Sequence, residues 1–259
     1  MHICPLPDGR TLRYEITGQG TPVFLLHGYL DSHKSFFRLF EALSAEHTLI
    51  AVDQRGHGES DPAPDYSIAG FTDDAILLLK HLALGPAHIV GHSLGGIVAQ
   101  RIAAAQPELV ESLALISTAR SAAGNPALAE AVPVLAALTD KVPDSLAVEF
   151  QASTTYAKLS AQIFAVYLAE TAKVSLATWR GALHGLLHEP APPPTPIAHP
   201  TIIIWGENDS LFSAADQDEL RDALPQARFI AMRTTGHAPN WERPDETAAA
   251  LLTFWSNLP

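Results

Sequence analysis

Short apolar runs alternate with longer amphipathic segments through the first half of the chain. Four runs are nearly free of charged residues and have the length of strands, at residues 23–26, 48–52, 88–92 and 113–118. Such runs suit strands that are buried on both faces of a parallel sheet. Helical spacing marks the intervening segments at residues 33–45, 70–82 and 94–106. This alternation predicts an α/β protein with a doubly wound, mostly parallel central sheet flanked by helices.

Both ends of the chain extend this pattern. Residues 2–5 and 10–16 are predicted to form a β-hairpin around the turn signal Pro7-Asp8-Gly9. The elements expected toward the C-terminus are strands at 201–205 and 228–231 and helices at 213–223 and 245–258.

A segment without strand signals interrupts the sheet pattern. Residues 120–190 are rich in Ala and Leu and predict three or four helices, broken near Pro126, Pro133 and Pro143. The proline-rich stretch at 190–196 then predicts a stiff connector. The predicted organisation is a core made of residues 1–119 and 196–259, with a helical cap and connector inserted at residues 120–195.

The composition narrows the range of partners. The 259 residues carry a formal net charge of -12, so neither nucleic acid nor an anionic membrane surface is an expected partner. No apolar run approaches the ~20 residues of a membrane span, and no secretory signal is visible. The single cysteine, Cys4, cannot form an intramolecular disulfide. This favours a reducing compartment, and the expected location is the cytoplasm.

One glycine-rich motif lies between a predicted strand and a predicted helix. The sequence Gly91-His92-Ser93-Leu94-Gly95 matches G-x-S-x-G. A sharp strand-to-helix turn of this kind exposes the serine hydroxyl, and the following helix directs its N-terminal N–H groups at developing negative charge. A serine that only caps the helix is the alternative, but the strand–motif–helix context favours Ser93 as a nucleophile.

Two further residues supply what a serine nucleophile needs. A serine hydroxyl must be activated by a base, and His237 follows the last predicted strand. Asp209 follows the strand at 201–205, so all three residues fall at the C-terminal edge of the sheet, where ligands of such sheets bind. Along the chain the three residues occur in the order Ser, Asp, His. This order is expected for hydrolases whose nucleophilic serine lies in such a strand-to-helix turn. The acid assignment leaves Glu207 open as an alternative, since it lies two residues from Asp209.

An oxyanion hole would complete the site with two N–H donors. Leu94 directly follows the proposed nucleophile and is expected to supply one from its backbone. The second is expected from the loop after the strand at 23–26, through the backbone N–H of Tyr29.

Taken together, these motifs resemble the α/β-hydrolase superfamily. The resemblance rests on His27-Gly28, the stretch from Asp53 to Ser60 (Asp-Gln-Arg-Gly-His-Gly-Glu-Ser), the serine motif, Gly206 to Asp209, and Gly236-His237. It covers the chain from about residue 10 to the end and is weakest in the helical insertion. It implies an eight-stranded sheet with a helical cap, the triad Ser93, Asp209 and His237, and neither a metal nor an organic cofactor.

These motifs together predict a serine hydrolase that cleaves a small carboxylic ester or lactone. Aromatic side chains of the insertion and of the loop after His237 are expected to line the substrate pocket, namely Phe150, Tyr156, Trp179 and Trp241. The sequence is also compatible with a homodimer. His184 and His188 have i, i+4 spacing, but without an evident third ligand they predict no metal site.

Three other functions are compatible with a serine nucleophile on this fold. They are hydrolysis of C–C bonds in ring-fission products, cofactor-free perhydrolysis, and small-molecule reception with slow turnover. The His27-Gly28 loop departs from the C–C hydrolases, since Tyr-Leu-Asp stands where a Gly-rich stretch is expected. Leu94 stands where perhydrolases usually carry Met.

Overall fold

A single mixed sheet forms the centre of the protein, as seen in a computed structural model that describes residues 1–191 and 197–258. Its eight strands are β1 (His2–Pro5), β2 (Thr11–Thr17), β3 (Thr21–Leu26), β4 (His47–Asp53), β5 (Ala87–His92), β6 (Val110–Ile116), β7 (Thr201–Gly206) and β8 (Arg228–Met232). They lie in the order β1-β2-β4-β3-β5-β6-β7-β8. Only β1–β2 and β2–β4 pair antiparallel. This confirms the predicted mostly parallel sheet and the N-terminal hairpin.

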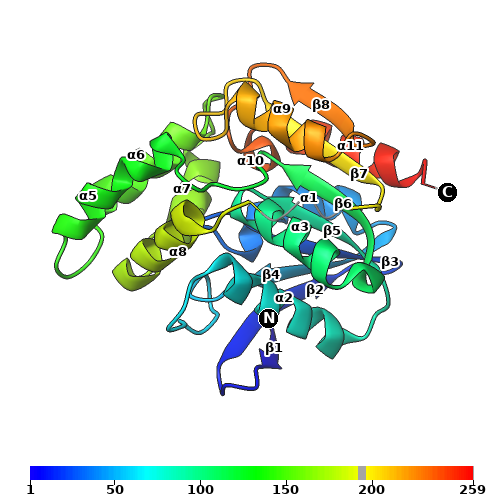
Figure 1. The fold of residues 1–259 in the computed structure, drawn as a ribbon, viewed down its shortest axis with the longest axis horizontal. Coiled ribbons are helices and arrows are strands. Elements are labelled where there is room, and N and C mark those ends of the chain that lie inside the picture. Colours follow the sequence, from blue (N-terminus) through cyan, green and yellow to red (C-terminus); the bar gives the residue numbers. More distant parts are fainter. Residues whose placement is uncertain (192–196, 259) are drawn as a thin grey trace.

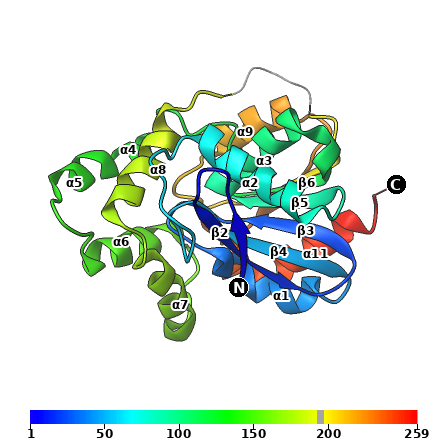
Figure 2. The same ribbon diagram turned by 90° about the horizontal axis from the view of Figure 1, so that it is seen from below.

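The described helices cover both faces of the sheet and one end of it. They are η1 (His33–Phe36), α1 (Phe37–Leu43), α2 (Ile68–Leu82), α3 (Leu94–Ala105), η2 (Pro107–Leu109), α4 (Pro126–Ala129), α5 (Ala131–Ala137), α6 (Asp144–Thr154), α7 (Ala161–Thr171), α8 (Leu176–His188), α9 (Ala214–Ala223), α10 (Pro239–Glu242) and α11 (Pro244–Trp255). Helices α1 and α11 pack on one face, whereas α2, α3 and α9 pack on the other (Figures 1 and 2).

Helices α4 to α8 form the insert between β6 and β7 and stand to one side of the sheet (Figures 1 and 2). Five described helices occur where three or four were predicted. The expected break at Pro133 is wrong, because Pro133 lies in the first turn of α5, where its missing N–H is not needed. Pro126 does begin a helix, and Pro143 directly precedes one. The predicted connector at 190–196 lies largely outside the described residues.

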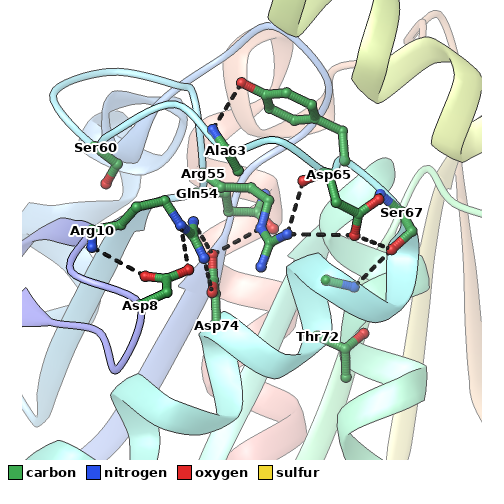
Figure 3. A network of polar contacts seen from close by, with 12 residues as sticks. Asp8, Arg10, Gln54, Arg55, Ser60, Ala63, Asp65, Ser67, Thr72 and Asp74 are labelled. Carbon is green, nitrogen blue, oxygen red and sulfur yellow. Dashed lines mark hydrogen bonds and ion pairs between the residues drawn. The ribbon is translucent and has the colours of Figure 1, made fainter.

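A buried ionic network holds the loop after β4 against α2 (Figure 3). Arg55 donates from Nε to Asp74 at 2.8 Å, and Arg10 forms two further bonds of 3.1 Å to the same carboxylate. Next to Arg55, Gln54 donates from Nε2 to the carbonyl of His27 at 2.7 Å. Its backbone N–H also donates to Nε2 of His27 at 3.0 Å. The network therefore fixes the residue that precedes Gly28 and the predicted oxyanion loop.

Among the described helices, none is both long and apolar enough to cross a membrane.

Candidate active site

Ser93 occupies a strained turn between β5 and α3. Its φ of 52° and ψ of -117° lie outside the regions that non-glycine residues normally adopt. The turn is held by a bond from the Ser93 N–H to the carbonyl of Ile116 at 2.9 Å and by the Thr118 hydroxyl, which donates to the Ser93 carbonyl at 2.7 Å. A Cβ on Gly91 or Gly95 would lie about 2 Å from neighbouring carbonyl oxygens, so both glycines are required sterically.

His237 and Asp209 meet at the same edge of the sheet. His237 Nδ1 lies 2.9 Å and 3.0 Å from the two carboxylate oxygens of Asp209, whose side chain is fully buried. Asp209 also accepts from the N–H groups of Leu211 at 2.8 Å and Phe212 at 3.0 Å. Glu207, the open alternative, is exposed. Because Nδ1 is engaged, Nε2 is the nitrogen of His237 that remains available to the Ser93 hydroxyl.

The loop that carries His237 is bound to the helical insert. Glu242 of α10 accepts from the backbone N–H of Gly236 at 2.9 Å and 3.1 Å. It also accepts from the N–H groups of Tyr156 at 3.0 Å and Ala157 at 2.6 Å, just after α6. The N–H of His237 itself donates to the carbonyl of Thr154 at 2.8 Å. We call this set of bonds the Glu242 clamp.

Two backbone donors lie close to Ser93. Leu94 is the first residue of α3, and Tyr29 lines the same pocket as Ser93. Neither N–H donates to another group of the described chain. A side chain at Gly28 would place its Cβ 2.9 Å from His92 Nδ1 and 3.2 Å from Ser93 Cβ, so only glycine lets this loop approach the serine.

His92 lies beside the proposed base but is held neutral. Its Nε2 donates to the backbone carbonyl of His237 at 2.8 Å. Burial lowers the pKa of His92 to about 3, with the nearby His237 adding to the effect. A histidine that is neutral throughout the physiological range supports the loop and does not exchange protons.

A small pocket connects these groups. Its volume of about 10 Å³ gives room for roughly one water molecule. Its walls are made by Gly28, Tyr29, Asp31, His92, Ser93, Leu128, Phe150, Thr154, Tyr167, Leu186, Leu211, Phe212 and His237. Residues of α4, α6, α7 and α8 contribute to this set, so the insert closes the pocket over the sheet edge.

Of the four aromatic residues expected in the pocket wall, the structure places only Phe150 there. Trp179 is buried behind it, with ring centroids 5.7 Å from Phe150 and 6.0 Å from Tyr29. Trp241 is also buried and stacks on Tyr167 at 4.5 Å. Tyr156 is 58% exposed and lies outside the pocket. Their positions depend on how helices of the insert pack, which the linear sequence does not specify.

Sequence reasoning missed two acidic residues that matter here, Asp31 in the pocket wall and Glu242 in the clamp. Asp31 had a detectable signal, because it lies four residues after His27 in the predicted oxyanion loop. Glu242 had none, since its partners are backbone groups. In the described part of the chain, no cluster of three or more metal-binding side chains occurs. The rings of His184 and His188 simply stack at 4.1 Å.

Comparison with known proteins relates the chain to hydrolases. Residues 21–244 match the family described as alpha/beta hydrolase fold. The chain is 29% identical to a 2-(acetamidomethylene)succinate hydrolase of Mesorhizobium japonicum, over 94% of this chain and 91% of that one. It is 28% identical to an sn-1-specific diacylglycerol lipase of Mus musculus, over 96% and 85%. The solved structure of an esterase from Exiguobacterium antarcticum shares the fold, with a TM-score of 0.90, 18% identity and coverage of 97% and 98%.

Proposed function

The chain belongs to the α/β-hydrolase family, and from that premise we propose that it is a serine hydrolase of small carboxylic esters or lactones. Ser93 is the nucleophile, His237 the general base and Asp209 the acid that orients the base. The observation that carries the proposal is the juxtaposition of a strained, pocket-lining Ser93 with a His237 whose Nδ1 is bound to buried Asp209.

The reaction proceeds through an acyl-enzyme. Ser93 Oγ attacks the substrate carbonyl carbon while its proton passes to Nε2 of His237. The carbonyl oxygen becomes an oxyanion, which accepts from the N–H groups of Tyr29 and Leu94. Collapse of this intermediate breaks the C–O bond, and His237 returns the proton to the leaving alcohol. Water then attacks the acyl group with His237 as base, which releases the acid and restores Ser93.

Asp209 has two functions in this sequence. It holds His237 in the tautomer that keeps the proton on Nδ1, and its charge stabilises the imidazolium that forms during attack. Two backbone N–H bonds fix the carboxylate itself. The insert excludes water from the pocket, which strengthens the interaction of the oxyanion with its donors.

The narrow pocket favours small acyl groups. Leu128, Leu186 and Phe150 close it from the insert, and Leu211 and Phe212 close it from the core. Because the pocket holds roughly one water molecule, even a short acyl group needs outward movement of these helices, and a longer chain needs more. Short esters should therefore have the highest kcat/KM.

A p-nitrophenyl ester series from acetate to decanoate tests the proposal, with Ser93→Ala alongside. We expect repeated turnover that is highest for short chains and is lost in the variant. A single release of one p-nitrophenol per chain, followed by no turnover, would favour the receptor function. No reaction with any ester by a folded protein would contradict the esterase proposal and favour C–C bond hydrolysis. Bromination of monochlorodimedone in a mixture of acetate, hydrogen peroxide and bromide, through peracetate that oxidises the bromide, would instead indicate perhydrolysis.

A further inference from the structure

A buried carboxylate stands in the wall of the pocket and has no part in the proposed triad. Asp31 is 1% exposed and lines the pocket together with Ser93 and His237. Most of the remaining wall is apolar or backbone, and none of the described lining residues is Lys or Arg. Since His92 is neutral, the ionised form of Asp31 is the main charge among the described lining residues outside the triad.

Hydrogen-bond donors of the protein do not occupy all the acceptor positions of the Asp31 carboxylate. Oδ1 accepts from the N–H of Ser32 at 2.9 Å and Oδ2 from Nε1 of Trp241 at 3.2 Å. The Ser35 hydroxyl is a third donor. A carboxylate offers about four acceptor positions, so these three donors leave one of them unused.

No cation in the described residues neutralises Asp31. Glu170 of α7 is an acidic neighbour that acts on Asp31, and it pairs with Lys34 at 2.7 Å and with Lys173 at 3.2 Å. Both ammonium groups therefore pair with Glu170, and Lys173 also pairs with Glu59 at 3.1 Å. Burial, with Glu170 as a further cause, raises the pKa of Asp31 to about 7. A group held in this way gains most from a ligand that brings a positive charge or a hydrogen-bond donor.

We infer that Asp31 selects the charge of the substrate: the pocket favours esters whose acyl or alcohol part carries an ammonium group or another hydrogen-bond donor, and it rejects esters that carry a second carboxylate. This inference rests on the proposed function and adds the substrate class. The physical reason is that a second anion in the pocket would lie against a carboxylate whose charge no described cation neutralises, a juxtaposition that is strongly unfavourable. An ammonium group would instead form a charge-assisted hydrogen bond there.

Three ethyl esters of similar size but different charge test the inference: ethyl 4-aminobutanoate, ethyl pentanoate and monoethyl succinate. Assays at about pH 8 keep Asp31 ionised, given its pKa of about 7. We expect kcat/KM for the ammonium ester to exceed that for the succinate by about 100-fold in the wild type. In Asp31→Asn the ratio should fall to about tenfold or less. Glu149→Gln removes one exposed charge from α6 without touching the pocket and should leave the ratio unchanged.

The outcomes separate the inference from the proposed function. Hydrolysis of p-nitrophenyl acetate by the wild type and not by Ser93→Ala establishes the esterase, whatever the charge preference. Equal kcat/KM for the three ethyl esters, or a preference for the succinate, would overturn the role of Asp31 alone. If no ester is cleaved, NMR titration of Ser93→Ala with butylammonium and with butyrate decides the matter. Tighter binding of butylammonium supports the inference, and equal or tighter binding of butyrate refutes it.

Discussion

Replacement of Glu242 by glutamine should uncouple the proposed base from the helical insert. In the wild type, the Glu242 carboxylate accepts from N–H groups of Gly236, Tyr156 and Ala157 at 2.6 to 3.1 Å. A longer bond of 3.4 Å joins it to Ala238. Glutamine keeps one acceptor oxygen and replaces the other with an NH₂ donor. At least one of the N–H groups would then face another donor.

The expected loss of stability in Glu242→Gln follows from the number of hydrogen bonds that are lost. Hydrogen bonds to a charged acceptor contribute roughly 1.5–3 kcal/mol each, and Glu242 is only partly buried, so the lower end applies. Two lost bonds would reduce the free energy of unfolding by about 3 kcal/mol. For a chain of this size that corresponds to a decrease in Tm of about 5–10 °C. Burial already raises the pKa of Glu242, so the charge itself is costly and the loss arises from unpaired donors.

The activity should fall at temperatures far below unfolding. Glu242 binds the residue before His237, and a displacement of about 1 Å in a reacting group can cost about 100-fold in rate. We therefore expect kcat for p-nitrophenyl acetate at 25 °C to fall by about 10- to 100-fold, with a smaller change in KM. Glu246→Gln, an exposed position in the first turn of α11, is the matched control and should behave like the wild type. A Tm that falls while kcat stays unchanged would show that the clamp is only structural and refute the reasoning.

Much of the fold follows from local patterns. The strands at 23–26, 48–52 and 201–205 are consecutive apolar residues, and a strand buried on both faces needs no information from elsewhere in the chain. Boundaries shifted by one to three residues at several elements, as with the helix predicted at 70–82 and observed as Ile68–Leu82. There the side chain of Ser67 accepts from Gly70 and caps the helix earlier than the apolar pattern suggests.

The proposed triad could be predicted from the sequence for a related reason. Ser93 directly follows β5, and Asp209 and His237 lie in the loops just after β7 and β8. Parallel strands bring their C-terminal ends to one edge. Their proximity is therefore a consequence of topology and not of side-chain packing.

The pocket wall was harder to predict because it depends on helix packing. Phe150 and Tyr156 lie six residues apart near the end of α6, yet one lines the pocket and the other is exposed. Tyr156 follows the helix, and its backbone N–H is bound to Glu242, which leaves its side chain outside. Contacts between segments about 85 residues apart leave no periodic signal in the sequence, so the clamp could not be anticipated.

Three further predictions address the triad and the buried acid. Asp209→Asn should reduce kcat by about 10⁴-fold through the wrong imidazole tautomer, whereas the exposed Glu207→Gln should change kcat less than about twofold. The same p-nitrophenyl acetate assay separates the two carboxylates, and the reverse ranking would move the acid to Glu207. Ser93→Gly should abolish turnover and raise the free energy of unfolding in urea by about 1 kcal/mol, since glycine tolerates φ of 52°; a less stable variant would contradict stored strain at the turn. The last prediction concerns stability and pH. Between the ordinary pKa of 3.8 and the raised value of about 7, the folded protein keeps the Asp31 proton that the unfolded chain has released. Stability from this group is therefore greatest at low pH and is lost as pH rises through that window. Asp31→Asn has no charge to bury, so relative to the wild type it should gain about 2–3 kcal/mol between about pH 5 and about pH 8. Urea unfolding of both proteins at the two pH values measures this gain. If the stability difference between the variant and the wild type were the same at both pH values, the Asp31 carboxyl would ionise in the pocket as freely as in water.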